Sequence, residues 1–219
     1  MFEFFALAQE CAPTVAPQTM AALVQVESAY NPYAIGVVGG AVRQPRNLDD
    51  AVRTAEALEA AGKNFSLGIA QVNRHNLARH NLTYRSAFEP CANLSAGAAI
   101  LQECYERAAL RFDDTQTALR ASLSCYYSGN FLRGFVPDAP GQKSYVEKVL
   151  AAAGLTPVVP ALSAPARPTG GQADDAPPKP SSSEPAPVPL RAVRAPPPNP
   201  APDVAKDDDF TKRNPKVVF

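Results

Sequence analysis

The sequence lacks an excess of charge of either sign, and it lacks a long apolar run. Its 21 Lys and Arg balance 21 Asp and Glu, so the formal net charge is zero. This balance argues against a generally basic nucleic-acid-binding protein. No stretch of 18 or more apolar residues occurs, whereas a membrane-spanning helix needs about 20. We therefore expect no nucleic-acid partner and no transmembrane segment.

The usual metal and nucleotide patterns are also missing. No Cys-x-x-Cys pair occurs, which argues against a zinc ribbon and a thioredoxin-type site. His75 and His80 are five residues apart, whereas two metal ligands on one helical face are four apart. The glycines between Gly36 and Gly40 are not followed by a helix with phosphate-binding spacing. We expect no metal and no cofactor.

Proline and the aromatic residues are distributed unevenly. Residues 1–150 hold 7 of the 23 prolines and 15 of the 17 Phe and Tyr, whereas residues 151–219 hold 16 prolines. A segment rich in proline and poor in core-forming residues does not fold by itself. We therefore expect a folded domain over 1–155 and a flexible, disordered Pro-rich tail over 156–219. The tail is interpreted equally well as an inert linker or as an arm that docks a partner.

The first residues form a short apolar patch from Phe2 to Leu7. The patch has no basic region before it and is shorter than the 7–15 apolar residues of a secretory signal, so the export signal is weak or missing from this start. The helical spacing of Phe4, Leu7 and Ala8 favours a first core helix. The alternatives are an unusual export route or a true start that lies upstream.

The remaining patterns predict a mainly α fold with a small β-hairpin. Residues 31–47 are rich in turn formers, with an irregular hairpin near 37–40, and residues 65–72 form a short extended run. The expected helices cover 17–28, 48–61, about 91–110, 114–128 and 138–153.

The four cysteines are Cys11, Cys91, Cys104 and Cys125. If 91–110 is one helix, Cys91 and Cys104 are about 20 Å apart, which is too far for a disulfide. Two pairings remain open: Cys11–Cys91 with Cys104–Cys125, or Cys11–Cys104 with Cys91–Cys125. Disulfides favour an oxidising compartment. The alternative is four buried free thiols in a cytoplasmic protein.

One carboxylate falls on an apolar helical face. Glu27 follows Met20, Leu23 and Val24 by seven, four and three residues, so it shares their side of the expected helix 17–28. Burial and the negative end of the helix dipole both raise the pKa of a carboxyl there. A carboxyl that stays protonated near neutral pH suits general-acid catalysis. The alternative is an acid at a frayed helix end that faces water.

A second carboxylate is missing from the neighbourhood in sequence. No acid lies between Ser28 and Leu48 or between Ala60 and Phe88, although most glycosidases use two. If Glu27 is catalytic, the pattern indicates chemistry in which the substrate supplies the nucleophile.

Four segments of the chain carry motifs whose order matters: Glu27-Ser28 with Asn31-Pro32, Ser66 to Gln71, Pro90 to Leu94 with Gly97, and Cys125 to Gly129. In this order they resemble the motifs of the lysozyme-like lytic transglycosylases with an SLT domain. Tyr127 stands where this family has Asn, and Ala70 stands where it has Met, which would trim the groove wall. The Y-Y-S-G variant and the Pro-rich tail look most like the peptidoglycan-opening component of VirB-type type IV secretion systems.

This resemblance implies a lysozyme-like α+β domain with a long groove for the glycan strands of peptidoglycan. Glu27 would cleave the bond between N-acetylmuramic acid and N-acetylglucosamine, without a cofactor, and would leave 1,6-anhydromuramyl ends. Ser28, Gln71, Asn73 and Tyr126 would contact or orient the substrate and the acid. The protein would be periplasmic and would open the cell wall during assembly of a secretion system, whose other components the tail would meet.

Two other functions fit the same residues. A muramidase on the same fold would use water as the nucleophile. A non-catalytic assembly factor would bind peptidoglycan and recruit secretion components.

Overall fold

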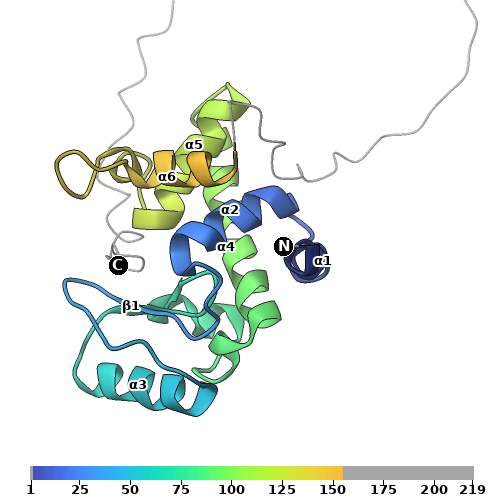
Figure 1. Cartoon of the computed structure of the whole chain (residues 1–219). Coiled ribbons are helices and arrows are strands. Elements are labelled where there is room, and N and C mark those ends of the chain that lie inside the picture. The colour runs from blue at the N-terminus through green and yellow to red at the C-terminus, as the bar shows by residue number, and fades with distance from the viewer. Residues whose placement is uncertain (1, 155–219) are drawn as a thin grey trace, which may run out of the picture. The chain divides into compact units, whose positions relative to one another are not determined.

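The computed structural model describes residues 2–154, which form six α-helices around a small antiparallel sheet (Figure 1). The mainly α fold expected from the sequence is confirmed. The expected tail over 156–219 lies outside the described residues, so the boundary at 155 stays a prediction. The helices are α1 Phe2–Cys11, α2 Pro17–Ser28, α3 Leu48–Ala60, α4 Pro90–Ala109, α5 Thr115–Ser128 and α6 Tyr145–Ala152; the strands are β1 Ile35–Val37, β2 Phe65–Leu67 and β3 Val72–Asn73; the short 3-10 turns are η1 Arg74–Asn76, η2 Ala78–His80, η3 Ser86–Phe88 and η4 Arg133–Phe135.

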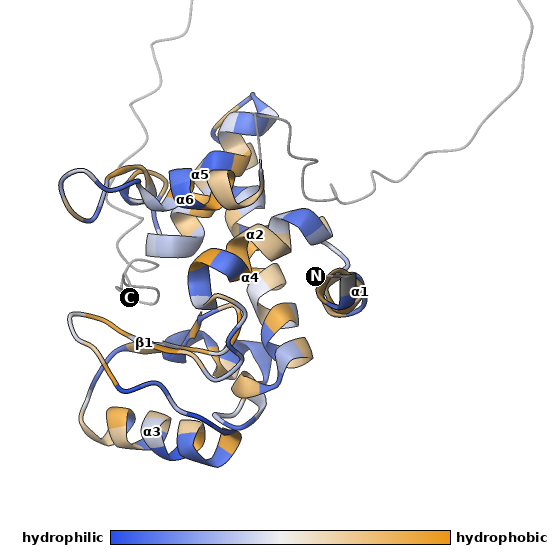
Figure 2. Ribbon diagram, viewed as in Figure 1, coloured by the Kyte–Doolittle hydropathy of each residue, from blue (hydrophilic) through white to orange (hydrophobic). Residues whose placement is uncertain are grey.

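Helix α4 is the central element, and α1, α2 and α5 lie around it (Figure 1). It begins with Pro90 at its first position, where the missing N–H costs nothing. Its apolar side chains Leu94 and Leu101 are fully buried in the core cluster, to which α2, α5 and the sheet also contribute residues. In Figure 2 the hydrophobic stretches of α2, α4 and α6 meet in this interior, whereas α3 keeps a hydrophilic outer side. None of the helices between residues 2 and 154 is long and apolar enough to span a membrane.

The sheet has three strands in the order β1-β2-β3, and both neighbouring pairs are antiparallel. The prediction of one extended run over 65–72 is therefore wrong for its middle residues, because the chain reverses its direction between β2 and β3. Gly68 takes a φ of +77°, and a Cβ there would lie 2.3 Å from the Ala87 carbonyl oxygen. Gln71 also takes a positive φ, of 50°. This tight reversal, which we call the 68–71 turn, converts a single strand into a hairpin.

The buried amide of Asn93 holds the 68–71 turn against α4. Its Nδ2 donates to the carbonyl oxygens of Leu67 at 2.9 Å and Ala87 at 2.7 Å, and its Oδ1 accepts from the Ala70 N–H at 2.7 Å. All of its side-chain hydrogen bonds are to backbone groups that would otherwise be buried without a partner. The sheet is thus fixed to the central helix by one side chain.

The start of α6 differs from the expected start at residue 138. The helix begins at Tyr145, because Pro140 and Gly141 (φ +76°) form a loop before it. Ser144 and Glu147 make a capping box, in which each side chain accepts a hydrogen bond from the backbone N–H of the other residue. The starts and ends of the other predicted helices agree with the structure to within a residue or so.

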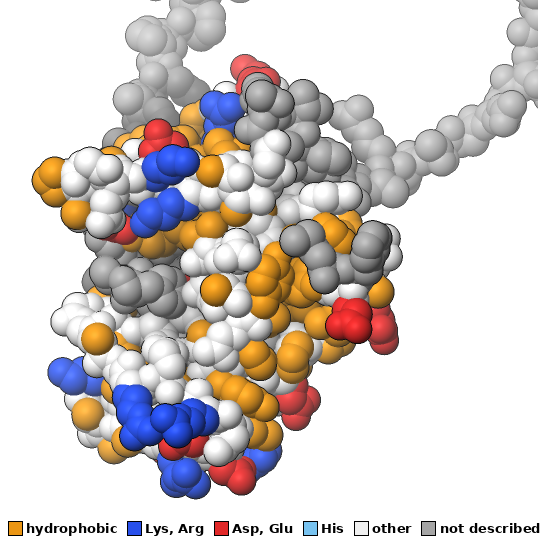
Figure 3. Space-filling view, viewed as in Figure 1, with side chains coloured by type: hydrophobic (Ala, Val, Ile, Leu, Met, Phe, Trp, Pro, Cys, Tyr) orange, Lys and Arg blue, Asp and Glu red, His pale blue; other side chains and the backbone are white. Residues whose placement is uncertain are grey.

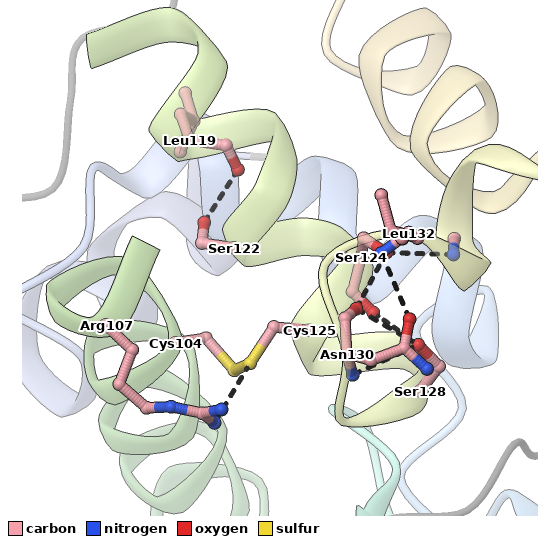
Figure 4. Close-up of a disulfide and its surroundings, with 10 residues drawn as sticks. Cys104, Arg107, Leu119, Ser122, Ser124, Cys125, Ser128, Asn130 and Leu132 are labelled. Atoms are coloured by element: carbon pink, nitrogen blue, oxygen red, sulfur yellow. Dashed lines mark hydrogen bonds between the residues drawn. A yellow bond between two sulfur atoms is a disulfide. The ribbon is translucent and has the colours of Figure 1, made fainter. Parts of the chain in front are cut away.

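Two disulfides join the helices, and they confirm the oxidised interpretation. Cys11 pairs with Cys91 across 80 residues and ties α1 to the start of α4. Cys104 pairs with Cys125 across 21 residues and ties α4 to α5, as Figure 4 shows. The first of the two pairings left open by the sequence is therefore the one that forms.

The two disulfides should stabilise the fold unequally. Removing Cys11–Cys91 by replacing both residues with alanine should cost about 4.5 kcal/mol, against about 3.4 kcal/mol for Cys104–Cys125, because the longer loop constrains the unfolded chain more. Urea unfolding of the two double variants measures this. Equal losses, or a larger loss from the shorter loop, would contradict the expectation.

Candidate active site

Glu27 lies in the last turn of α2 with only 6% of its surface exposed. The helix ends directly after it, because Ala29 (φ 50°) and Tyr30 (φ 64°) both adopt left-handed backbone conformations. Two consecutive non-glycine residues in that region are unusual and are stabilised only by their surroundings. This sharp exit turns the chain into β1 and leaves the carboxyl of Glu27 at the junction of helix and sheet.

Burial raises the pKa of Glu27 from 4.5 to about 8, and the hydroxyl of Tyr145 opposes part of that rise by donating a hydrogen bond to the carboxyl. This upward shift of the pKa is the one that the sequence predicts for an acid on the apolar face at the end of a helix. At neutral pH the group is mostly protonated, so it can act as a proton donor and still function as a base after it has lost the proton.

A groove of about 390 Å³ opens beside Glu27. It runs along β1 and the loop that follows it, so the end of α2 forms one wall and the sheet edge forms the other. Of the described residues that line it, only Glu27 carries a carboxyl. The lining residues are Gln25, Val26, Glu27, Ser28, Ala29, Asn31, Ala34, Ile35, Gly36, Val37, Gly40, Ala41, Val42 and Gln44.

The groove wall along β1 is built by Gln44. Its amide accepts from the Ile35 N–H at 3.0 Å and donates to the Ile35 carbonyl at 2.9 Å. One side chain therefore occupies the place of a neighbouring strand at this sheet edge. This contact holds the loop between β1 and α3 along the groove.

Ser28 lies at the end of α2 and lines the groove. Its hydroxyl donates to the carbonyl oxygen of Ile69 at 2.7 Å and, more weakly, to that of Val24 at 3.3 Å. Ser28 therefore joins the end of the acid's helix to the 68–71 turn. Ser28 therefore acts on Glu27 indirectly, by fixing the backbone at the end of α2.

Gln71 is buried in the 68–71 turn. Its Nε2 donates to the carbonyl oxygens of Ala34 at 2.9 Å and Gly68 at 2.8 Å. Within the described part of the chain, its buried Oε1 has no hydrogen-bond partner. Ala34 lines the groove, so Gln71 braces the groove floor from behind and keeps one acceptor unused.

Asn73 lies in β3, and the structure does not bring it to the groove lining. Its Nδ2 donates to Asn64 Oδ1 at 3.0 Å, and its Oδ1 accepts from the His75 N–H at 3.1 Å, which starts η1. Ala70, which stands where the family has Met, is fully buried and is also absent from the lining.

Tyr126 projects from α5 onto the 68–71 turn, where its hydroxyl donates to the Ala70 carbonyl at 2.5 Å. Burial, and then the nearby charge of Glu27, raise the pKa of Tyr126 above its ordinary value. A Cβ at Gly97 would lie 2.7 Å from Ala70 Cβ and 3.1 Å from the Tyr126 hydroxyl. Gly97 therefore leaves the space in which α4, α5 and the turn meet.

Tyr145 is the site residue that the sequence did not reveal. It is the first residue of α6, 118 positions after Glu27, and its ring is buried. The signal that could have found it is Ser144-x-x-Glu147, which marks a helix start and places an aromatic ring at a fixed first position. The expectation of one helix over 138–153 concealed that start.

Charged side chains on the outer surface are mixed. On the face shown in Figure 3, Lys and Arg side chains are scattered over α3, beside α6 and near the top of the view, with Asp and Glu close to them. This arrangement is unlike the contiguous basic surface that a nucleic-acid backbone needs. Among the described residues, no group of three or more His, Cys, Asp and Glu could hold a metal.

Comparison with known families agrees with this geometry. The model of the transglycosylase SLT domain matches residues 4–130, which include Glu27 and the turn beside it. The chain therefore belongs to the transglycosylase SLT domain family. Tyr145 lies beyond the matched residues.

The relatives are more specific. The chain is 61% identical over 158 residues to the type IV secretion system protein virB1 of Brucella abortus, an alignment that covers 71% of this chain and 66% of that protein. It is 35% identical over 164 residues to protein virB1 of Agrobacterium fabrum, covering 74% and 63%. The chain thus spans just under two thirds of the length of these relatives. No solved structure matches it significantly.

Replacing Glu27 with glutamine should stabilise the fold increasingly as the pH rises. The folded acid has a pKa of about 8 against 4.5 in the unfolded chain, so the folded state binds more protons between these values. Its stability therefore falls as the pH rises, by up to about 1.4 kcal/mol per pH unit. The amide does not titrate and escapes this loss.

Thermal unfolding of the parent and Glu27→Gln at several pH values between 4.5 and 8 measures the effect. Glu56→Gln, at an exposed site on α3, is the control. The difference in stability between this variant and the parent should not change with pH. A Glu27→Gln variant that becomes relatively less stable toward pH 8 would show that the acid is held as a carboxylate.

Replacing Tyr145 with phenylalanine should raise the pKa of Glu27 further, because the hydroxyl that stabilises the carboxylate is lost. If Glu27 acts as a general acid, activity falls as the pH rises through its pKa. The basic limb of the pH–rate profile should therefore move to higher pH while the maximal rate drops. A limb that moves to lower pH would contradict the assigned direction of this hydrogen bond.

Proposed function

We propose that this protein is a lytic transglycosylase that cleaves the bond between N-acetylmuramic acid and N-acetylglucosamine in peptidoglycan. The observation that carries the proposal is a single buried carboxyl, Glu27, with a raised pKa, in a groove whose described lining holds no second acid. Most glycosidases that use an enzymatic nucleophile or an activated water have a pair of carboxylates. One carboxyl suffices when the sugar attacks itself.

Glu27 first donates its proton to the glycosidic oxygen, and the bond from that oxygen to the muramyl C1 breaks. The 2-acetamido group of the muramyl sugar stabilises the cation. The Glu27 carboxylate then removes the proton of the 6-hydroxyl, whose oxygen bonds to C1 and closes the 1,6-anhydro ring. The acid regains the proton that it gave, and no water is consumed.

The neighbouring residues support this cycle in different ways. Tyr145 donates to the carboxyl and stabilises its anionic state between the two proton transfers. Ser28 and Tyr126 fix the 68–71 turn against the end of α2 and against α5. Gln71 supports the groove floor by donating to the carbonyl oxygens of Ala34 and Gly68. Asn73 supports the site indirectly, through its hydrogen bonds to Asn64 and to the His75 N–H at the end of the sheet.

The biological setting follows from the relatives. Both are named virB1, and the one in Brucella is named a type IV secretion system protein. We infer that the protein works in the periplasm and opens the cell wall locally for a secretion system. The two disulfides support an oxidising compartment. Residues 156–219, the Pro-rich tail, would contact other secretion components.

Digestion of purified sacculi by the full chain, followed by mass spectrometry of the released muropeptides, tests the reaction. The parent should release 1,6-anhydromuramyl products, and Glu27→Gln should release at least about a hundredfold less, because general acid–base catalysis contributes about 10²–10⁴-fold. Glu56→Gln should match the parent.

Other products would overturn the proposal. Reducing-end muropeptides would make the protein a muramidase that uses water. Sacculi that are bound but not cleaved by the parent would make it an assembly factor.

A further inference from the structure

Tyr127 stands where the family motif has asparagine, and the proposed reaction gives it no role. It projects from the last turn of α5, and its ring stacks on the ring of Tyr145 with centroids 4.5 Å apart and planes 14° apart. Both rings are nearly fully buried. Tyr127 therefore contacts the residue that donates to Glu27, and it does so through a ring face that asparagine does not have.

The hydroxyl of Tyr127 is anchored on its far side. It donates to Asp138, whose two carboxylate oxygens each lie 2.9 Å away. Arg133 donates to the same carboxylate at 2.8 Å and to the Val136 carbonyl at 2.8 Å. Because Asp138 is paired with a cation, it holds the phenol without leaving an uncompensated charge near the acid.

The loop that carries Arg133 and Asp138 is itself fixed to α5. Asn130 Oδ1 accepts from the N–H groups of Leu132 at 3.0 Å and Arg133 at 2.8 Å, and the Gly134 N–H donates to Ser124 Oγ at 2.9 Å. A Cβ at Gly134 would lie 2.6 Å from Ser124 Cα, so only glycine permits this approach. Figure 4 shows these contacts gathered on the side of α5 that faces away from the disulfide.

We propose that Tyr127 is a positioning residue, which holds the ring of Tyr145 in the plane where its hydroxyl donates to Glu27, with Asp138 and Arg133 as its anchor. The capping box at Ser144 fixes the backbone of Tyr145, but it leaves the side-chain torsions free. Stacking on an anchored ring removes that freedom, as preorganisation of an acid–base pair requires.

The titration of Glu27 depends on the groups that surround it, so a variant of any of these groups can change that titration. Tyr145 faces it from α6 through a hydrogen bond, and Tyr126 and Tyr127 feel its charge from α5. Asp138 accepts from the Tyr127 hydroxyl, and Arg133 is paired with Asp138. The inference rests on the proposed function for its kinetic consequences, whereas the contact between Tyr145 and Glu27 can be measured in the resting protein.

The experiment labels tyrosine at the ring carbon that bears the hydroxyl and follows Tyr145 by ¹³C NMR while the pH is raised. In the parent, the Tyr145 signal should shift as Glu27 titrates near pH 8. Tyr127→Leu removes the stack and should reduce that shift by at least half. Tyr127→Phe keeps the stacked ring but loses its anchor at Asp138, so its shift should lie between those of the parent and Tyr127→Leu. Should the leucine variant fail to fold, Tyr127→Met removes the ring with an unbranched, flexible side chain that adapts better to the space left behind.

Turnover on sacculi gives the second measurement. Tyr127→Leu should lower kcat by about tenfold or more, the value of a lost charge-assisted hydrogen bond, with KM changed by less than about twofold. Adding Tyr145→Phe to Tyr127→Leu should cost less than Tyr145→Phe costs in the parent, because both changes weaken the same contact. Tyr127→Phe, which keeps the stacked ring but not its anchor, should give an intermediate kcat.

A matched control exists far from the acid. Tyr84 donates to Glu59, which Arg74 pairs at 2.7 Å, so the same Tyr–carboxylate–Arg arrangement occurs beside the sheet. Tyr84→Phe should leave the Tyr145 titration and kcat unchanged.

Unchanged Tyr145 titration in Tyr127→Leu, or losses of kcat that add up in the double variant, would overturn the inference. If the parent releases no anhydro products but Tyr127→Leu still abolishes the titration shift, the proposed function fails and the positioning role stands.

Discussion

The contact between Glu27 and Tyr145 is the interaction on which the rest of the structure depends. A buried carboxyl is costly unless it is protonated or receives hydrogen bonds, and here both conditions hold. The contact requires α2 and α6 to pack together, although 118 residues separate the two side chains. The left-handed exit at Ala29 and the capping box at Ser144 each end or start a helix within two residues of this contact. The fold therefore brings two helix ends together around one proton.

The 68–71 turn is the second constraint, because three helices meet the sheet there. Asn93 reaches it from α4, Tyr126 from α5 and Ser28 from α2, and each makes a hydrogen bond to its backbone. The family motifs are scattered along the chain, yet several of their residues converge on this turn. Their common task is to set the distance between the acid's helix and the groove floor. Gly68 and Gly97 belong to the same arrangement, since a side chain at either would force the layers apart.

Much of this was predictable where local periodicity decides the outcome. The apolar stripe on α2 placed Glu27 on the buried side of its helix, and proline and capping residues placed most helix ends. The partners of Glu27 were not predictable in the same way, because the stack of Tyr145 on Tyr127 and the anchor at Asp138 depend on how distant segments pack. The choice between two disulfide pairings likewise needed the relative positions of α1, α4 and α5. Periodicity also treated 65–72 as one strand, since positive φ at Gln71 leaves no mark in an apolar pattern.

The burial that sets the acid also favours one outcome of the proposed reaction. A carboxyl surrounded by Tyr126, Tyr127 and Tyr145 has a raised pKa because water is largely excluded from it. Most inverting hydrolases use a second carboxylate to activate and place a water molecule. The described groove lining offers no such group, whereas the 6-hydroxyl of a bound muramyl sugar arrives already attached to the reacting ring, at high effective concentration. The aromatic enclosure thus supplies the proton at neutral pH and leaves the substrate's own hydroxyl as the favoured nucleophile. In this chain Tyr127 contributes to the raised pKa of Glu27 and to the stabilisation of its carboxylate. Its ring is one of the three that surround the acid, and it stacks on Tyr145, which donates to the carboxyl.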